Sequence, residues 1–368
     1  MDDQSHMRAA LALARRGLGQ CWPNPAVGCV VVNQGRVVGR AVTAAGGRPH
    51  AEPLALAMAG AATRGATVFV TLEPCCHHGR TPPCTDALIA AGVARVVVAA
   101  RDCDPRVSGA GVARLHEAGI AVEVGLLGDE AEELNAGFFA RLRLGRPLVT
   151  LKLASTLDGR IATHGGESRW VTGAAARRAA HALRGRSDAI LVGVGTVLTD
   201  DPDLTCRIDG FRATPLVRVV ADSHLRTRLT ARLVATADET PTWILSRPDA
   251  DAERRRALTA TGVTVIEVGA AGAGAGLGVD LAEGLRTLAQ RGITRLLVEG
   301  GAQLAAALLR ADLVDRVAWF HAPAIMGADG WPAAQAFGVA DLATMPRFVR
   351  TATRPVGEDV LTELRRAA

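Results

Sequence analysis

Apolar residues along the chain follow two alternating patterns, one with helical spacing and one of short β-branched runs. The first helical segment covers residues 5–17, and strand-like runs follow at 27–33 and 36–39. Because strands and helices continue to alternate, the pattern predicts a three-layer α/β/α domain. Further helices are predicted at 51–63, 83–91, 111–118 and 129–144, and further strands at 67–72, 95–99 and 121–125.

The alternation is interrupted at Gly145-Arg146-Pro147 and begins again with a strand at 148–154. Glycine and proline end helices, so we place a domain boundary here, between residues 1–146 and 147–368. The second domain is also predicted to be α/β, with a surface loop in its glycine- and alanine-rich tract Gly269–Gly278. Its further strands are predicted at 189–194, 216–221, 242–246, 264–268, 295–299 and 317–322, and its helices at 174–184, 281–291 and 302–310.

Composition narrows the class of protein. No apolar run reaches the roughly 20 residues that a membrane span requires. Arginines interrupt the apolar N-terminal stretch, which therefore resembles an amphipathic helix and not a signal peptide. Seven scattered cysteines favour metal or reactive roles over a disulfide framework. We therefore expect a cytoplasmic enzyme with no membrane partner.

Charge and aromatic content argue against a nucleic-acid partner. The net charge is only +5, aromatic residues make up 3% of the chain, and no basic block is present. Lys152 is the single lysine among 42 basic residues. Arginine replaces lysine at most surface positions but not where a compact ammonium group is required, so Lys152 is predicted to belong to a site. The alternative is that one lysine survives by chance.

His50-Ala51-Glu52, Cys75 and Cys84 form the most informative group of residues. One imidazole and two thiolates are typical of a catalytic zinc site whose fourth position is open to water. Zinc lowers the pKa of that water to about 7, and a nearby carboxylate, here Glu52, can move protons as general acid and base. Each of the three ligands is predicted to lie near the start of a helix, where free N–H groups stabilise thiolates.

Two alternatives remain open for this site. A closed structural zinc site would need a fourth ligand, and Cys76, His77 and His78 are close in sequence. The adjacent Cys75 and Cys76 are also not distinguished by spacing. The remaining cysteines have no partner pattern and are predicted to be ordinary apolar residues; they are Cys21, Cys29, Cys103 and Cys206.

The His-x-Glu and later Pro-Cys pattern resembles the cytidine-deaminase-like superfamily. Eight residues separate the two cysteines, and this insert, together with Pro23–Cys29, resembles the deaminase half of the bifunctional deaminase/reductase family of riboflavin biosynthesis. The resemblance implies one Zn2+ per chain, held by His50, Cys75 and Cys84, with Glu52 as proton shuttle.

The same resemblance implies a pyrimidine site in which Asn24 and His77 hold the base and Arg80 faces the substrate phosphate. Taken without the resemblance, Asn24 lies between two prolines as a turn residue would, and Arg80 is equally a solvated loop charge.

Glycine-rich motifs mark the second domain. Gly193-Val194-Gly195-Thr196 follows a strand and predicts a turn or a weak phosphate loop. A second strand ends in Glu299-Gly300-Gly301 before a helix, a position that suits a pyrophosphate. The three-glycine dinucleotide fingerprint with a later acid is missing, so a standard Rossmann domain is not expected.

Together these segments resemble, in order, the reductase half of the same family, whose fold is similar to that of dihydrofolate reductase. The resemblance implies an NADPH site and a ribosyl-phosphate site. The implied NADPH contacts are Ala154, Trp170, Thr196, Asp200, Ser223 and the loop Gly301, Ala302, Gln303, Leu304, Ala305, Ala306 and Ala307. The implied substrate contacts are Ser168, Arg184, Leu204, Arg207 and Glu299.

Chemical arguments add roles and alternatives for these residues. Lys152 is expected beside the reacting carbon, where an ammonium group can donate a proton as hydride arrives. Planar guanidinium groups at Arg184 and Arg207 suit a phosphate monoester. Trp170 is equally a core residue, and Asp200 a turn residue before a proline.

The sequence therefore predicts a bifunctional enzyme that deaminates a phosphoribosylaminopyrimidine and then reduces its ribosyl side chain with NADPH. We also expect it to form a homo-oligomer. One alternative is a nucleic-acid base deaminase with a fused binding domain, which the low aromatic content and the long cysteine insert disfavour. Another is a zinc-stabilised binding module in which Glu52 has no catalytic role.

Overall fold

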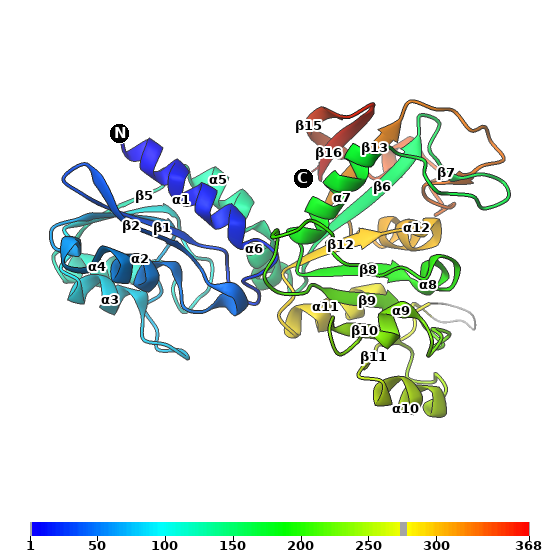
Figure 1. The fold of residues 1–368 in the computed structure, drawn as a ribbon, viewed down its shortest axis with the longest axis horizontal. Coiled ribbons are helices and arrows are strands. Elements are labelled where there is room, and N and C mark those ends of the chain that lie inside the picture. Colours follow the sequence, from blue (N-terminus) through cyan, green and yellow to red (C-terminus); the bar gives the residue numbers. More distant parts are fainter. Residues whose placement is uncertain (1, 273–277, 368) are drawn as a thin grey trace. The chain divides into compact units, whose positions relative to one another are not determined.

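The chain folds into two compact units, Met1–Arg146 and Pro147–Ala368, in a computed structural model that describes residues 2–272 and 278–367 (Figure 1). Each unit has its own α/β layers and its own hydrophobic core, which confirms the expected fold class. Part of the glycine- and alanine-rich tract predicted as a loop, residues 273–277, lies outside the described residues.

The first unit is a sheet between two layers of helices (Figure 1). Its strands are β1 (Gly28–Asn33), β2 (Arg36–Val42), β3 (Thr67–Leu72), β4 (Arg95–Ala100) and β5 (Ala121–Val124). Its helices are α1 (Asp3–Gly17), η1 (Ala45–Gly47), α2 (Ala51–Ala59), η2 (Gly60–Thr63), α3 (Cys84–Ala90), α4 (Ala110–Glu117), α5 (Gly128–Leu134) and α6 (Ala136–Leu144). The strands lie in the order β2-β1-β3-β4-β5, with β3, β4 and β5 parallel and β1 antiparallel to both of its neighbours.

Continuous valine-rich runs explain why β1, β3 and β4 lie at the centre of this sheet. Nearly every residue of these strands is buried, as expected for strands covered on both faces. The buried stripe of α1 packs on β1 so closely that a Cβ atom at Gly28 would lie 1.9 Å from the Ala10 carbonyl oxygen.

One predicted helix is divided in the structure. The segment expected to be a single helix over 129–144 forms α5 and α6. The helical backbone is interrupted at Asn135, whose buried side chain forms hydrogen bonds with the backbone of Ala26. Its Oδ1 accepts a hydrogen bond from Ala26 N at 3.0 Å, and its Nδ2 donates one to Ala26 O at 3.1 Å.

The second unit is built on a nine-stranded sheet in the order β11-β10-β9-β8-β12-β6-β13-β16-β15. Its strands are β6 (Leu148–Thr156), β7 (Arg160–Ala162), β8 (Ala189–Gly193), β9 (Val217–Ala221), β10 (Thr242–Ser246), β11 (Thr264–Glu267), β12 (Arg295–Glu299), β13 (Arg316–Ala322), β14 (Trp331–Pro332), β15 (Phe348–Val356) and β16 (Asp359–Arg366). Its helices are α7 (Ala174–Gly185), α8 (Val194–Asp200), α9 (Arg232–Ala235), α10 (Ala252–Ala260), α11 (Leu281–Gln290), α12 (Ala302–Arg310) and η3 (Leu342–Thr344). In this order, the seven neighbouring strands from β11 through β10, β9, β8, β12 and β6 to β13 all pair in parallel. Strands β7 and β14 pair with each other in a separate two-stranded sheet.

The C-terminal hairpin of β15 and β16 was not expected from the pattern. It adds two antiparallel strands beyond β13, with mostly exposed residues in β15. Strands with so few buried positions lack the apolar alternation on which sequence prediction depends. Among the described residues, no helix is long and apolar enough to cross a membrane.

We expect Gly28→Ala to destabilise the first unit by about 1–3 kcal/mol, because the new methyl group must push α1 away from β1. Thermal unfolding followed by circular dichroism measures the effect as a lower Tm. Gly79→Ala is the matched control, since a Cβ atom there meets only the end of the flexible Arg48 side chain, at 3.5 Å. Equal losses in the two variants would contradict the proposed packing constraint.

Candidate functional sites

Three side chains of the first unit bring nitrogen and sulfur donor atoms together. Nδ1 of His50 lies 3.3 Å from Sγ of Cys84 and 3.6 Å from Sγ of Cys75, and all three donor atoms lie within 4.8 Å of one another. A tetrahedral zinc ion with ordinary Zn–N and Zn–S bonds separates such atoms by about 3.5 Å. The group therefore fits zinc without rearrangement.

The elements that carry these ligands differ from the prediction in one respect. His50 is the residue before α2, and Cys84 is the first residue of α3. Cys75 was also expected near a helix start, but it lies in the loop after β3, because the chain has to turn here before it reaches α3. The start of α3 still provides a backbone donor for this sulfur atom, since Cys84 N donates a hydrogen bond to Cys75 Sγ at 3.4 Å.

Hydrogen bonds among the three ligands shift their protonation. The bond from Cys84, together with one from His50, lowers the pKa of Cys75 to about 4 although burial opposes this. The hydrogen bond between His50 and Cys75 raises the pKa of His50. A separate hydrogen bond between Cys84 and Cys75, together with burial, raises the pKa of Cys84. Donor atoms so crowded that they compete for protons are suited to a shared cation.

The structure distinguishes the two adjacent cysteines. Cys76 is turned away from the group, and its Sγ lies 3.6 Å from the carbonyl oxygen of Arg106. Within residues 2–272 and 278–367, no fourth histidine, cysteine or carboxylate joins His50, Cys75 and Cys84. The fourth position of a tetrahedral ion is therefore left for water, as in catalytic sites.

Glu52 lies in the first turn of α2 and is buried. Burial raises the pKa of its carboxyl group. A carboxyl group with a raised pKa exchanges its proton more readily near neutral pH, which is the property that a general acid and base needs.

The three residues expected to contact the substrate differ in their surroundings, and of the three, Asn24 contacts one of the metal ligands. Nδ2 of Asn24 is 3.4 Å from His50 Nε2 and donates to Gly47 O at 2.7 Å, so Asn24 has contacts that an ordinary turn residue would not make. Nδ1 of His77 is buried and has no hydrogen-bond partner among the described residues. Arg80 is exposed in the same loop.

Sequence reasoning missed the carboxylate that supports the Cys75 loop. Glu73 is buried at the end of β3 and accepts three backbone N–H bonds, from Asp102, Gly109 and Val112, at 3.0–3.3 Å. It thereby fixes the loop to the start of α4. Burial also raises the pKa of Asp102 to about 6, but no spacing in the sequence indicated either residue.

A cavity of about 470 Å³ opens in the second unit at the ends of β8 and β12. Six lysine and arginine side chains but only four acidic ones line it, which favours an anionic ligand. Many of the predicted contacts line this cavity: Lys152, Ala154, Ser168, Trp170, Arg184, Thr196, Asp200, Leu204, Arg207 and Glu299.

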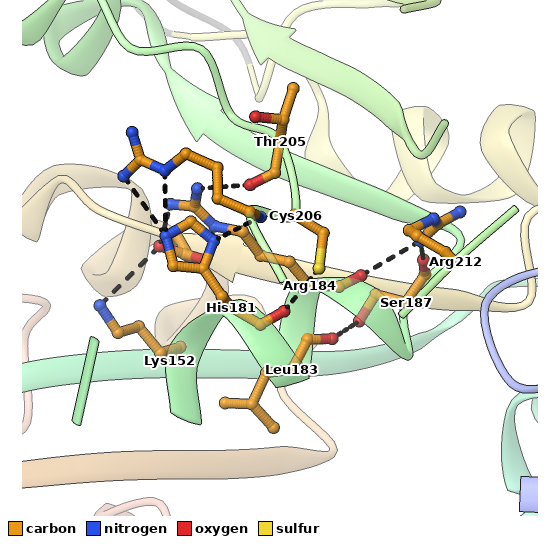
Figure 2. Close-up of polar contacts among 10 residues, drawn as sticks. Lys152, His181, Leu183, Arg184, Ser187, Thr205, Cys206 and Arg212 are labelled. Atoms are coloured by element: carbon orange, nitrogen blue, oxygen red, sulfur yellow. Dashed lines mark hydrogen bonds and ion pairs between the residues drawn. The ribbon is translucent and has the colours of Figure 1, made fainter. Parts of the chain in front are cut away.

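The charges of three of these residues are joined in one network (Figure 2). Nε and Nη2 of Arg184 donate to the Glu299 carboxylate at 2.7 and 2.9 Å, and Nζ of Lys152 lies 3.8 Å from the same carboxylate. Burial alone would raise the pKa of Glu299, but the charges of Arg184 and Lys152 outweigh it and lower the pKa to about 2. The parallel pairing of β12 with β6 sets Glu299 directly opposite Lys152.

Three alternatives from the sequence are wrong or need correction. Trp170 is 65% exposed, with the Arg177 guanidinium 4.6 Å from its ring, so it is not a core residue. The Gly-x-Gly-Thr segment with Thr196 is not a turn, because it begins α8 directly after β8. Asp200 ends α8, and Nη2 of Arg169 donates to its carbonyl oxygen at 3.1 Å.

Residues 302–307, named as part of the implied NADPH loop, lie in α12, where the sequence pattern predicted a helix at 302–310. Gly301 precedes α12 with a positive φ of 82°, and Gly300 has a φ of 84°, with its Cβ position 3.2 Å from Oγ1 of Thr196. Of the remaining residues, Leu304, Ala305 and Ala306 pack in the core because they occupy the inner face of α12. Ser223 lies outside the cavity lining, and its Oγ accepts a hydrogen bond from Val279 N at 3.1 Å.

Several residues that line the cavity were not predicted, among them Arg169, Arg177 and His181. His181 lines the cavity from α7, three residues before Arg184 and therefore on the same face of the helix. The sequence did offer this spacing as a signal.

Comparisons with known proteins agree in both units. Residues 1–100 match the family model described as the cytidine and deoxycytidylate deaminase zinc-binding region. Residues 147–362 match the model of the RibD C-terminal domain.

Similar proteins cover the whole chain. The riboflavin biosynthesis protein RibD of Escherichia coli (strain K12) is 43% identical over 99% of both chains, and that of Aquifex aeolicus is 42% identical over 88% of both. The solved structure of Acinetobacter baumannii RibD matches with a TM-score of 0.89 and 37% identity, covering 100% of this chain and 99% of that one. A Thermotoga maritima diaminohydroxyphosphoribosylaminopyrimidine deaminase/5-amino-6-(5-phosphoribosylamino)uracil reductase matches with a TM-score of 0.85 and 34% identity, covering 99% and 98% of the two chains.

We expect Cys75→Ser to remove the bound zinc and Cys76→Ser to retain it, because only the Sγ of Cys75 lies with the other two donor atoms. Elemental analysis of the purified variants measures the zinc content, which should be about one ion per chain in the wild type and in Cys76→Ser. Loss of zinc from Cys76→Ser, or its retention by Cys75→Ser, would contradict this choice of ligands.

Glu299→Gln should destabilise the second unit by about 3–5 kcal/mol at pH 7, because Arg184 and Lys152 lose the charge that balances theirs. The folded pKa of about 2 lies below the ordinary 4.5, so the contribution of Glu299 is complete above pH 4.5 and is lost as the pH falls towards 2. The difference between wild type and variant should therefore shrink over that range.

Urea unfolding followed by tryptophan fluorescence measures this difference, since four of the five tryptophans lie in the second unit. Glu267→Gln is the control, because it removes a carboxylate from an exposed pair with Arg255 and should cost less than about 1 kcal/mol. A difference for Glu299→Gln that does not change with pH would contradict the charge network.

Proposed function

The chain belongs to the RibD family of bifunctional riboflavin biosynthesis proteins, and we propose that residues 1–146 carry its deaminase site and residues 147–368 its reductase site. The protein is a zinc-dependent deaminase and an NADPH-dependent reductase that acts on small molecules. The assignment of particular residues to the two reactions is supported by the geometry described above.

The deaminase proposal depends on a single observation, the open three-ligand group with a buried carboxylate in the adjacent turn. Zinc held by His50, Cys75 and Cys84 supplies the positive charge that makes water nucleophilic at neutral pH. Glu52 takes a proton from the water as it attacks the ring carbon that bears the amine, and returns protons to the departing ammonia.

Substrate recognition in the first unit is assigned to three residues. Asn24 and His77 hold the pyrimidine, and the exposed Arg80 pairs with the phosphate. The unpartnered Nδ1 of His77 supports this assignment, because a buried polar atom is costly unless a ligand satisfies it. Asn135 fixes the backbone of Ala26 and so steadies the segment that presents Asn24.

In the second unit, NADPH supplies the hydride that converts the ribosyl side chain to ribityl. Lys152 lies next to Glu299 and donates a proton at the oxygen or nitrogen where negative charge develops as hydride arrives. Arg184 and Arg207 bind the substrate phosphate, while Glu299 orients Arg184 and Lys152 in addition to its predicted substrate contact. Thr196, Gly300 and Gly301 lie together at the start of α12, where free backbone N–H groups suit a pyrophosphate.

The substrate that fits both sites is a diamino-(phosphoribosylamino)pyrimidinone, deaminated first and reduced second. A nucleic-acid substrate is not proposed, since the cavity of the second unit has the size of a small-molecule site. A cytoplasmic location stays a prediction, supported by seven cysteines that form no disulfide among the described residues.

A homo-oligomer is proposed on the basis of the C-terminal hairpin. Strand β15 forms an edge of the nine-stranded sheet, and apolar side chains such as Val349 and Val360 are exposed on this hairpin. Exposed sheet edges with apolar side chains favour pairing with another chain.

We expect Glu52→Gln to lower ammonia release by about 10²-fold or more, because the amide cannot move protons. The same variant should reduce supplied deaminated substrate at the wild-type rate, measured as NADPH oxidation. Lys152→Gln should show the opposite result, with normal ammonia release and slow NADPH oxidation. Glu117→Gln, an exposed change on α4, is the control and should affect neither step. If Glu52→Gln also halted NADPH oxidation, two independent sites would be excluded.

A further inference from the structure

His181 on α7 contacts Arg207, which belongs to the segment of residues 201–207 that helps to line the reductase cavity. The backbone N of Arg207 lies 3.2 Å from Nδ1 of His181, and Nε and Nη2 of Arg207 both lie 3.3 Å from Nε2 of His181. All three groups on Arg207 are donors, but a neutral imidazole carries a lone pair on only one of its two ring nitrogens. In the tautomer with its proton on Nδ1, Nε2 of His181 accepts from the Arg207 guanidinium, whereas an imidazolium accepts from neither group.

The segment that carries Arg207 depends on α7 for its position. Residues 201–207 have no regular secondary structure, and Leu204 is buried with a positive φ of 52°. Side chains and carbonyl groups of α7 and this segment are joined at two further points (Figure 2): Sγ of Cys206 donates to His181 O at 3.2 Å, and Nη1 of Arg184 donates to Thr205 O at 3.0 Å. Unlike the bond from Arg184, the contacts with the His181 ring depend on which of its nitrogens carry a proton.

The titratable and charged groups around His181 come from four parts of the fold. They are Arg184 on α7, Asp203, the Cys206 thiol and Arg207 on the segment, Glu299 on β12 and Lys152 on β6. Burial, followed by the charges of Arg184 and Arg207, lowers the pKa of His181. Neutral His181 therefore accepts from Arg207, while protonated His181 would repel it.

We propose that His181 is a positioning residue of the reductase, which holds Arg207 in place for the substrate phosphate only while its imidazole is neutral. This inference rests on the proposed reductase function. It predicts that the KM for the phosphorylated substrate rises in acid through His181, while kcat, which depends on Lys152 and the hydride donor, does not change through it.

The test compares KM and kcat for NADPH oxidation at pH 5.5 and 8.0 in the wild type and in His181→Gln. Glutamine offers an acceptor oxygen that does not titrate, so the variant should bind well at both pH values. The substrate phosphate itself titrates near pH 6, but it does so equally for both proteins. We expect the ratio of KM at pH 5.5 to KM at pH 8.0 to be at least about 3-fold larger in the wild type.

Two further variants make the result decisive. His321→Gln is the matched control, since His321 lies on β13 outside the cavity lining and should keep the wild-type ratio. Arg207→Gln should raise KM at pH 8.0 and give the same small pH ratio as His181→Gln, because His181 acts through Arg207. Arg207→Gln also tests the proposal if His181→Gln does not fold.

The outcomes separate the two proposals. If wild-type protein does not oxidise NADPH with the deaminated substrate, the proposed reductase function fails. If it does, but His181→Gln and Arg207→Gln keep the wild-type pH ratio, the role of His181 is refuted. An effect of His181→Gln on kcat alone would also refute it.

Discussion

Buried charge has to be balanced, and both sites of this protein are organised by that requirement. In the first unit, a histidine and two cysteines place electron-rich atoms so close together that a cation is needed among them. In the second unit, the buried carboxylate of Glu299 is balanced by Arg184 and Lys152. The surrounding strands and helices fix these groups at short distances, and the chemistry of each site follows from the charge that remains available to a ligand.

The two units solve the problem with different scaffolds. The zinc ligands come from a loop and two helix starts, where backbone N–H groups are free to assist. The carboxylate of the second unit is instead placed by strand register, because β12 pairs with β6 so that Glu299 and Lys152 are neighbours. Register in a buried parallel sheet is strongly specified, so the ion pair needs no loop to position it.

Sequence patterns predicted the elements with strong apolar periodicity and missed those without it. The central strands of both sheets lie where their valine- and leucine-rich runs placed them. Strand β15 is mostly exposed, β16 is mostly half-buried and ends in two arginines, and α8 is a short helix in a glycine motif. None of these elements has a pattern that separates it from loop. Cys75 and Cys76 were indistinguishable by spacing because only the path of the loop decides which thiol faces His50. His181 was missed because its importance depends on Arg207, which is distant in sequence.

The loop between Cys75 and Cys84 is anchored at both ends by parts of the fold that do not depend on its length. Glu73 fastens its beginning to α4, and α3 fixes its end. The geometry of the metal ligands is therefore held from outside residues 76–83. This division of labour leaves the segment with His77 and Arg80 to contact the proposed substrate, while the anchors on α3 and α4 keep the donor atoms in place.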